Sequence, residues 1–181
     1  APTGSSSIDL RDSSDLGEST VDNLTSDNTP TFSIPSGPYY RVYRDGTLVS
    51  ASYATGLFTS AVLDDGVYLF TSTAVDAAGN ETGPGIPLSV TISTIRPPAP
   101  TTPLDLAPAS DSGVSDSDNI TNIQYVQFIL PSGLHNLRVY RDDLAEAIVH
   151  DPGTTYFENL SPDQTHVWTY TVSDAAGNES L

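Results

Sequence analysis

The sequence predicts an all-β protein made of two tandem β-sandwiches of about seven strands each, and three observations support this class. The 181-residue chain repeats itself at an offset that drifts from 96 to 98 residues. Each copy contains short stretches rich in β-branched and aromatic residues, separated by turn sequences roughly every 8–12 residues. No stretch shows the apolar period of an amphipathic helix.

The internal repeat covers almost the whole chain and sets the domain boundaries. DNLTSDNTPTFSIPSG, for example, aligns without a gap with DNITNIQYVQFILPSG. The matching segments are 22–37 with 118–133, 41–45 with 138–142, and 75–82 with 173–180. We therefore expect one domain over 1–96 and a second over 97–181. The junction IRPPAPTTP at 95–103 is Pro-rich, which predicts a short, semi-rigid spacer.

The strands of the first copy follow in order along the chain. The expected elements are a strand at 29–34, a hairpin at 39–53, and strands at 56–63, 66–76 and 86–94. Asp45-Gly46 suits the type I′ turn of the hairpin. In GVYLFTSTAVD, alternation places Tyr68, Phe70 and Ala74 on one face.

The second copy has the same order of elements but stops after DAAGNES. We expect it to lack the counterpart of 86–94, which would leave an unpaired sheet edge. The natural protein is therefore expected to continue beyond these residues.

The charge of the chain excludes several partners. The chain has 23 acidic residues and six basic ones, and its net charge is −17. Nucleic acid and anionic lipid both need basic clusters, and no apolar run approaches the length of a membrane span. A chain this acidic favours cations as partners.

The acidic residues are concentrated in one stretch of each copy. DLRDSSDLGESTVDN (9–23) contains Asp9, Asp15 and Asp22, and DLAPASDSGVSDSDN (105–119) repeats the pattern with Asp105, Asp111 and Asp118. Such a dense run repels itself. Calcium, which takes six to eight oxygen ligands, would remove that repulsion. The alternative is a solvated polar loop, and DAAGN is open to a similar simple interpretation as a turn.

Sandwich topology leaves two locations open for the calcium. Loops of a sandwich lie at its two ends, so stacking the copies predicts a site at their junction. That site would use Asp15, Asp22 and Asp65 from the first copy, Asp105 and Asp174 from the second, and carbonyls of the Pro-rich linker. If the first strand is too short to cross the sandwich, each copy instead has its own site. Those sites would use Asp9, Asp15, Asp22 and Asp76, and likewise Asp105, Asp111, Asp118 and Asp174.

The sequence resembles the bacterial Ig-like domains repeated in giant surface adhesins and biofilm-associated proteins. DL…SD.G.S…DN.T, TPTF, VYRDG and G.Y.F…A.DAAGN carry the resemblance. It implies a secreted protein on the bacterial surface in which calcium stiffens a string of domains. The second copy departs from the pattern at NIQYVQF, so it lacks counterparts of Asp27 and Pro30.

We therefore expect a structural extender that projects an adhesive region, not an enzyme. The first copy has no His, so it cannot supply a Ser-His-Asp triad. One alternative is a module that binds host or matrix glycan or protein through alternating Arg and Tyr, such as Arg41, Tyr43, Arg138 and Tyr140. Another is a pair of accessory domains of a secreted polysaccharide-degrading enzyme. The expected partners are calcium and neighbouring repeats of the same chain.

Overall fold

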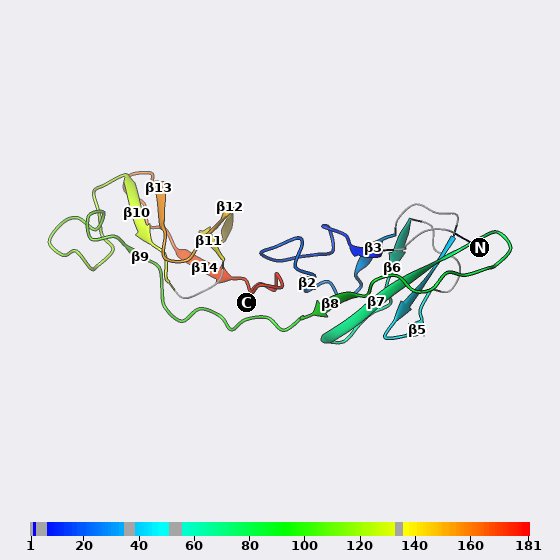
Figure 1. The fold of residues 1–181 in the computed structure, drawn as a ribbon. Helices are drawn as coiled ribbons and strands as arrows, with labels where there is room; N and C mark the ends of the chain where they lie inside the picture. The colour runs from blue at the N-terminus through cyan, green and yellow to red at the C-terminus, as the bar shows by residue number, and fades with distance from the viewer. Residues whose placement is uncertain (1, 3–6, 35–38, 51–55, 133–135) are drawn as a thin grey trace. The chain divides into compact units, whose positions relative to one another are not determined.

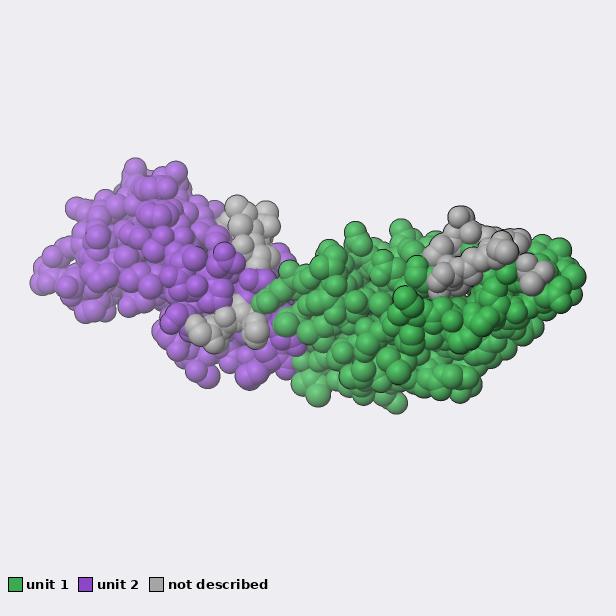
Figure 2. Space-filling view, viewed as in Figure 1, with its two compact units in different colours: residues 1–95, 175–178 green, residues 96–174, 179–181 purple. Residues whose placement is uncertain are grey.

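The computed structural model describes residues 2, 7–34, 39–50, 56–132 and 136–181. By internal contacts the chain divides into two compact units (Figure 2): unit 1 holds 1–95 with 175–178, and unit 2 holds 96–174 with 179–181. Every regular element of the described residues is a β-strand. None of these residues belongs to a helix long and apolar enough to cross a membrane.

Unit 1 is a sandwich of two sheets. Its strands are β1 (Asp9–Leu10), β2 (Leu24–Thr25), β3 (Thr31–Ser33), β4 (Tyr39–Arg44), β5 (Thr47–Leu48), β6 (Leu57–Thr59), β7 (Gly66–Val75) and β8 (Leu88–Ile92). One sheet has the order β1-β3-β6 and the other β2-β8-β7-β4-β5 (Figure 1). The predicted all-β sandwich is confirmed.

The start of unit 1 crosses from one sheet to the other. In β1, Leu10 pairs with Phe32 of β3, whereas β2 runs parallel to β8 with Leu24 opposite Thr91. The acidic residues between β1 and β2 therefore form the crossing. Strand β2 was not predicted, because two residues are too few to show a period.

The core of unit 1 confirms the predicted face of β7. Phe70 is fully buried, its ring centroid lies 4.3 Å from that of Phe32, and Ala74 is buried on the same face. Tyr68 is partly buried beside this core, and its hydroxyl donates to the carbonyl of Asp64 at 2.9 Å. Alternation thus sets which side chains of β7 fill the sandwich as far as Ser72, after which residues 73–75 are all buried.

The predicted hairpin forms between β4 and β5. Asp45 has φ 50° and Gly46 has φ 78°, the positive values that a type I′ turn requires. Tyr43 pairs with Leu48 next to this turn. The end of the predicted hairpin, residues 51–53, lies outside the described residues.

Unit 2 repeats the plan with six strands. They are β9 (Asp105–Leu106), β10 (Tyr125–Ile129), β11 (Leu137–Arg141), β12 (Leu144–His150), β13 (Thr155–Asn159) and β14 (Trp168–Val172). The sheets have the orders β13-β10-β9 and β12-β11-β14. In the described part of the chain, no strand pairs with β14 on the side away from β11, as expected for a copy without its final strand.

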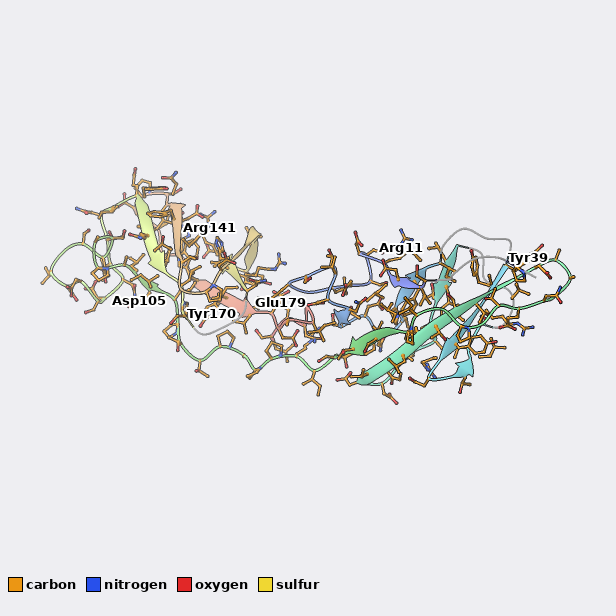
Figure 3. All side chains as sticks on the ribbon, in the orientation of Figure 1. Arg11, Tyr39, Asp105, Arg141, Tyr170 and Glu179 are labelled. Atoms are coloured by element: carbon orange, nitrogen blue, oxygen red, sulfur yellow. The ribbon has the colours of Figure 1, made fainter. Side chains whose placement is uncertain are left out.

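Unit 2 also fixes part of the Pro-rich segment. Tyr170 of β14 (Figure 3) donates its hydroxyl to the carbonyl of Thr102 at 2.8 Å. Leu104 packs against buried Leu137 and Tyr170. The end of the segment is thus attached to the core of unit 2.

Candidate metal centre in the acidic loops

Two loops carry the predicted acidic residues, acidic loop 1 (residues 11–23) and acidic loop 2 (residues 107–119), and both begin with the same turn. The amides of Ser14 and Asp15 donate to the carbonyl of Arg11 at 2.7 and 2.8 Å. The amides of Ser110 and Asp111 donate to the carbonyl of Ala107 at 2.7 and 3.0 Å. The two copies therefore fold alike at this point.

A buried serine attaches each loop to its neighbouring strand. The hydroxyl oxygen of Ser14 accepts the amide of Thr31 in β3 at 3.0 Å. Its counterpart Ser110 accepts the amide of Gln127 in β10 at 2.9 Å. Both serines are more than 90% buried, so each hydroxyl satisfies an amide that water reaches poorly.

The far end of each loop is closed by an asparagine in the left-handed region. Asn23 has φ 59° and Asn119 has φ 58°, a conformation that Asn tolerates better than most residues. The Asn23 amide donates to Oδ2 of Asp15 at 3.2 Å, and the Asn119 amide donates to Oδ2 of Asp111 at 3.0 Å. This geometry draws the two ends of the loop together around one carboxylate.

That carboxylate is buried in both copies, and one of its oxygens has no donor. Asp15 is 1% exposed and Asp111 is 3% exposed. Oδ1 of each is buried and has no hydrogen-bond partner among the described residues. A buried carboxylate oxygen without a partner costs free energy that a bound cation would offset. The two acidic loops thus fit a cation.

The charge around Asp15 supports the same interpretation. Burial raises the pKa of the Asp15 carboxyl, the Asn23 amide lowers it, and repulsion from Asp22, Asp12 and Asp9 raises it further. Strand β1 is only two residues long, so Asp9 lies next to acidic loop 1 instead of a strand length away. The negative charges of Asp9, Asp12 and Asp22 therefore act on the buried carboxyl of Asp15.

The other loop acids face solvent. Asp22 and Asp118 each accept the amide two residues ahead, at 3.0 and 3.1 Å, in a local turn. Asp105 is exposed at the start of β9. No three or more Asp, Glu or His side chains are grouped in the described residues so that they could hold a metal ion. A calcium ion here would therefore need main-chain carbonyl and water oxygens as well.

Two predicted ligands of unit 1 have other contacts at opposite ends of β7. Asp65 precedes this ten-residue strand and accepts the amide and the hydroxyl of Thr94 at 3.0 and 2.7 Å. Asp76 follows it and accepts the amides of Ala78 and Asn80, which form the predicted turn. Acidic loop 1 lies at the Asp65 end, because Thr25, whose hydroxyl donates to the Ser14 carbonyl, pairs with Ile92, and Ile92 pairs with Gly66. Ten residues of strand span about 33 Å, so Asp76 is not brought to the loop. Asp174 takes the place of Asp76 after β14, and the junction arrangement stays a prediction.

A second polar cluster was missed in the sequence. The carboxylate of Glu81 accepts from Tyr43 at 2.6 Å and Thr73 at 2.5 Å, and it pairs with Arg41 at 2.7 Å. The hydrogen bond from Thr73 has the largest effect on the pKa of Glu81, followed by the one from Tyr43. Together they hold this pKa below its usual range, although burial acts to raise it.

Unit 2 repeats this cluster around Glu179. Its carboxylate accepts from Thr171 and Tyr140 and pairs with Arg138. The same Arg, Tyr, Thr and Glu recur in both copies of the sequence, and this recurrence could have indicated the cluster. The alternating Arg and Tyr side chains are thus engaged within each unit, which weakens the alternative of a glycan-binding face there.

Comparison with known proteins agrees with this architecture. A search of curated proteins found no match. Among solved structures, the fibronectin(III)-like modules of Clostridium thermocellum CbhA match with a TM-score of 0.55 at 15% identity. The alignment covers 97% of this chain and 90% of that one, and it shows the fold alone. The family model described as bacterial Ig-like domain matches residues 3–94 and again residues 97–181. The chain therefore belongs to the bacterial Ig-like domain family, as two tandem copies.

Proposed function

We propose that the chain is a non-catalytic spacer of a secreted bacterial surface protein, and that calcium at the acidic loops stiffens it so that it projects an adhesive region. Bacterial Ig-like domains are typically extracellular, which supports the location. One observation carries the proposal. The same buried carboxylate, with one oxygen unsatisfied, occurs in both copies at Asp15 and Asp111.

The residues that would hold the ion follow from the loop geometry. Oδ1 of Asp15 and Oδ1 of Asp111 would be direct ligands, because nothing else in the described residues satisfies them. Asp9 and Asp22 in one copy, with their counterparts in the other, would add negative charge. Carbonyl and water oxygens would complete the six to eight ligands that calcium takes.

The consequence for the domain is mechanical. Acidic loop 1 crosses between the two sheets of unit 1, from β1 to β2. Without a cation, repulsion among its carboxylates loosens this crossing. With calcium at the concentrations that extracellular modules sense, about 10⁻⁴–10⁻³ M, the loop becomes fixed. A stiffer domain end suits a spacer in a string of repeats.

The experiment is small-angle X-ray scattering of the chain with excess EDTA and then with millimolar calcium, beside melting curves in the same buffers. Sodium chloride at matched ionic strength controls for screening of the net charge of −17. We expect calcium to raise the melting temperature and to narrow the range of chain dimensions.

The outcomes separate the parts of the proposal. A higher melting temperature with unchanged dimensions would keep calcium at the acidic loops and remove it as the cause of stiffness. No response of either quantity beyond the sodium chloride control would contradict the calcium proposal and leave solvated loops.

A second candidate function rests on one exposed pair. Tyr125 and Phe157 lie on the outer face of the β9-β10-β13 sheet with ring centroids 5.4 Å apart, 57% and 46% exposed. The first copy has Thr29 and Thr59 at these positions. Exposed aromatic side chains are typical of binding faces, so this face is where a glycan or protein partner would bind. A Y125T/F157T variant should lose that binding and keep its fold. The role of accessory domains in a polysaccharide-degrading enzyme stays a prediction.

A further inference from the structure

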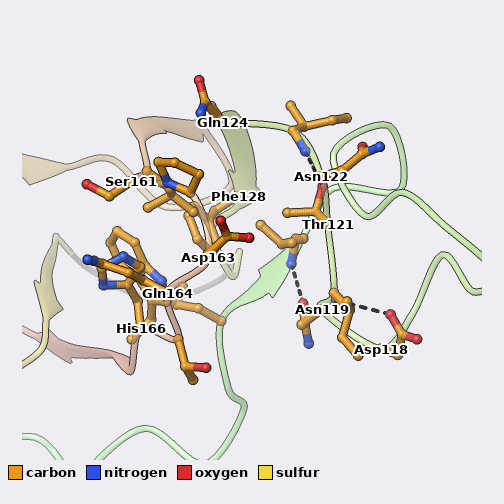
Figure 4. A pocket seen from close by; sticks show the side chains of 18 residues that line it. Asp118, Asn119, Thr121, Asn122, Gln124, Phe128, Ser161, Asp163, Gln164 and His166 are labelled. Atoms are coloured by element: carbon orange, nitrogen blue, oxygen red, sulfur yellow. Dashed lines mark hydrogen bonds between the residues drawn. The ribbon is translucent and has the colours of Figure 1, made fainter.

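A hollow opens at one side of unit 2, next to the first residues of β14. One wall is formed by residues 118–124 and the other by 160–166, and Leu104, Leu106, Phe128 and Trp168 contribute apolar surface. Figure 4 shows Asn119 and Thr121 on one side of this hollow, and Gln164 and His166 on the other. Side chains from segments far apart in the chain thus surround one space.

The walls correspond to the residues that hold β8 in unit 1. There, Leu24 and Thr25 pair in parallel with Thr91 and Ile92. On its other side, β8 pairs antiparallel with Gly66–Phe70. The repeat places Ile120 and Thr121 at the positions of Leu24 and Thr25, and residues 164–168 at the positions of Gly66–Phe70. All of these residues of unit 2 line the hollow except Val167.

The backbone of residues 166–168 has amides and carbonyls that could form hydrogen bonds with an added strand at the hollow. The amide of Val167 donates to Asp142, and its carbonyl accepts the Asp142 amide, both on the side of β11. Amides and carbonyls alternate in direction along an extended strand, so those of His166 and Trp168 point the other way, toward the hollow. An unpaired edge of this kind is a template for an added strand.

The side chains of β8 show what such a strand must carry. Val90 and Ile92 are 0% and 1% exposed, and both belong to the core of unit 1. The equivalent space in unit 2 has Trp168 and Phe128 in contact, with ring centroids 4.7 Å apart, beside Leu106. An occupant therefore needs apolar side chains at alternate positions and polar ones between them.

We propose that the hollow is an acceptor for an added β-strand with the chemistry of β8, an extended peptide whose inward residues match Leu88, Val90 and Ile92. The strand would run antiparallel to 164–168 and parallel to 120–121. Main-chain hydrogen bonds supply affinity and the inward side chains supply specificity, as in other cases of strand addition. This proposal does not depend on calcium.

The test uses the one tryptophan of the chain as its reporter. Trp168 is the only tryptophan, and it lines the hollow. The peptide PLSVTIST, which copies residues 87–94, is titrated into the full chain while the Trp168 emission is recorded. We expect a saturable shift to shorter wavelength. The control peptide, with V90D and I92D, should leave the emission unchanged because it puts carboxylates into an apolar space.

A variant of the acceptor edge completes the test. A His166→Pro chain loses one edge amide and the matched His166→Ala chain keeps it, while both lose the contact of His166 with Asp142. The His166→Pro chain should bind the peptide several-fold more weakly than the His166→Ala chain. No change in emission at millimolar peptide, or an equal change with the control peptide, would overturn the proposal. Equal binding by the His166→Pro and His166→Ala chains would overturn the pairing with 164–168.

Discussion

The backbone amide of Asn23 donates to Oδ2 of Asp15 at 3.2 Å, and this contact satisfies one oxygen of a buried carboxylate while Oδ1 has no donor in the described residues. The same relationship recurs between Asn119 and Asp111 at 3.0 Å. A purely structural aspartate would be expected to use both oxygens. The recurrence in two copies with different surrounding sequence supports the proposed cation site.

The first prediction concerns D15N and D111N. Asn can still accept the amide through its oxygen, and its NH₂ group would face neighbouring carboxylates. In EDTA we expect D15N to melt at or above the temperature of the parent chain. With about 10 mM calcium the parent should gain roughly 1–3 kcal/mol, for a dissociation constant of about 10⁻⁴–10⁻³ M, and the double variant should gain nothing.

The control for this prediction is Asp64→Asn, an exposed aspartate outside the acidic loops. It should keep the full calcium response. The pKa of Asp15 is raised by burial, so in EDTA the parent should become more stable as the pH falls through that pKa, and D15N should lack this gain. An unchanged calcium response in D15N/D111N would contradict the assignment.

The second prediction tests the left-handed residue that closes each loop. Asn23 has φ 59°, which costs most residues other than Asn, Asp and Gly about 1 kcal/mol or more. Asn23→Ala should therefore lower the free energy of unfolding by about 1 kcal/mol, and Asn23→Gly should lower it less. Urea denaturation measures both. Equal losses in the two variants would show that the asparagine side chain matters more than the backbone conformation.

A third prediction separates two neighbouring serines. Ser14 is 4% exposed and accepts the Thr31 amide, whereas Ser13 is exposed. Ser14→Ala leaves a half-buried amide without its acceptor and should cost about 1–2 kcal/mol. Ser13→Ala should fall within about 0.5 kcal/mol of the parent. Urea denaturation measures the free energy of unfolding of both variants. Similar losses in the two would show that the Ser14 hydroxyl does not stabilise the loop.

The fourth prediction concerns pH and the cluster around Glu81. Hydrogen bonds from Thr73 and Tyr43 lower the pKa of this carboxyl, so its stabilisation is complete above the unfolded pKa, about 4.3. It is lost as the pH falls through the lower folded pKa. Glu81→Gln should cost about 1–2 kcal/mol at pH 7 and less at pH 3. Melting temperatures from pH 3 to 7 test this, and a loss that does not depend on pH would contradict it.

The sequence predicted the repeat, the sandwich and the turns because these depend on local patterns. Asp45-Gly46 alone indicates the hairpin turn, and the alternation within β7 alone indicates which side chains face the core. Strand β2 was not predicted because two residues are too few to show a period, and the Glu81 cluster was not predicted because it arises from contacts between segments far apart in the chain. Likewise Asp15 stood out only as one acid among several. Its burial depends on Ser14 and Asn23, which the sequence marked only by their recurrence in the second copy.

The most direct test of the central claim is calorimetric titration of calcium into the chain at low ionic strength, after removal of metal with EDTA. We expect the parent chain to bind calcium saturably, with one ion for each acidic loop. The Asp15→Asn chain should bind one ion, and the D15N/D111N chain should bind none. Binding that survives in the double variant, or no binding in the parent at millimolar calcium, would contradict the claim that these buried carboxylates hold calcium.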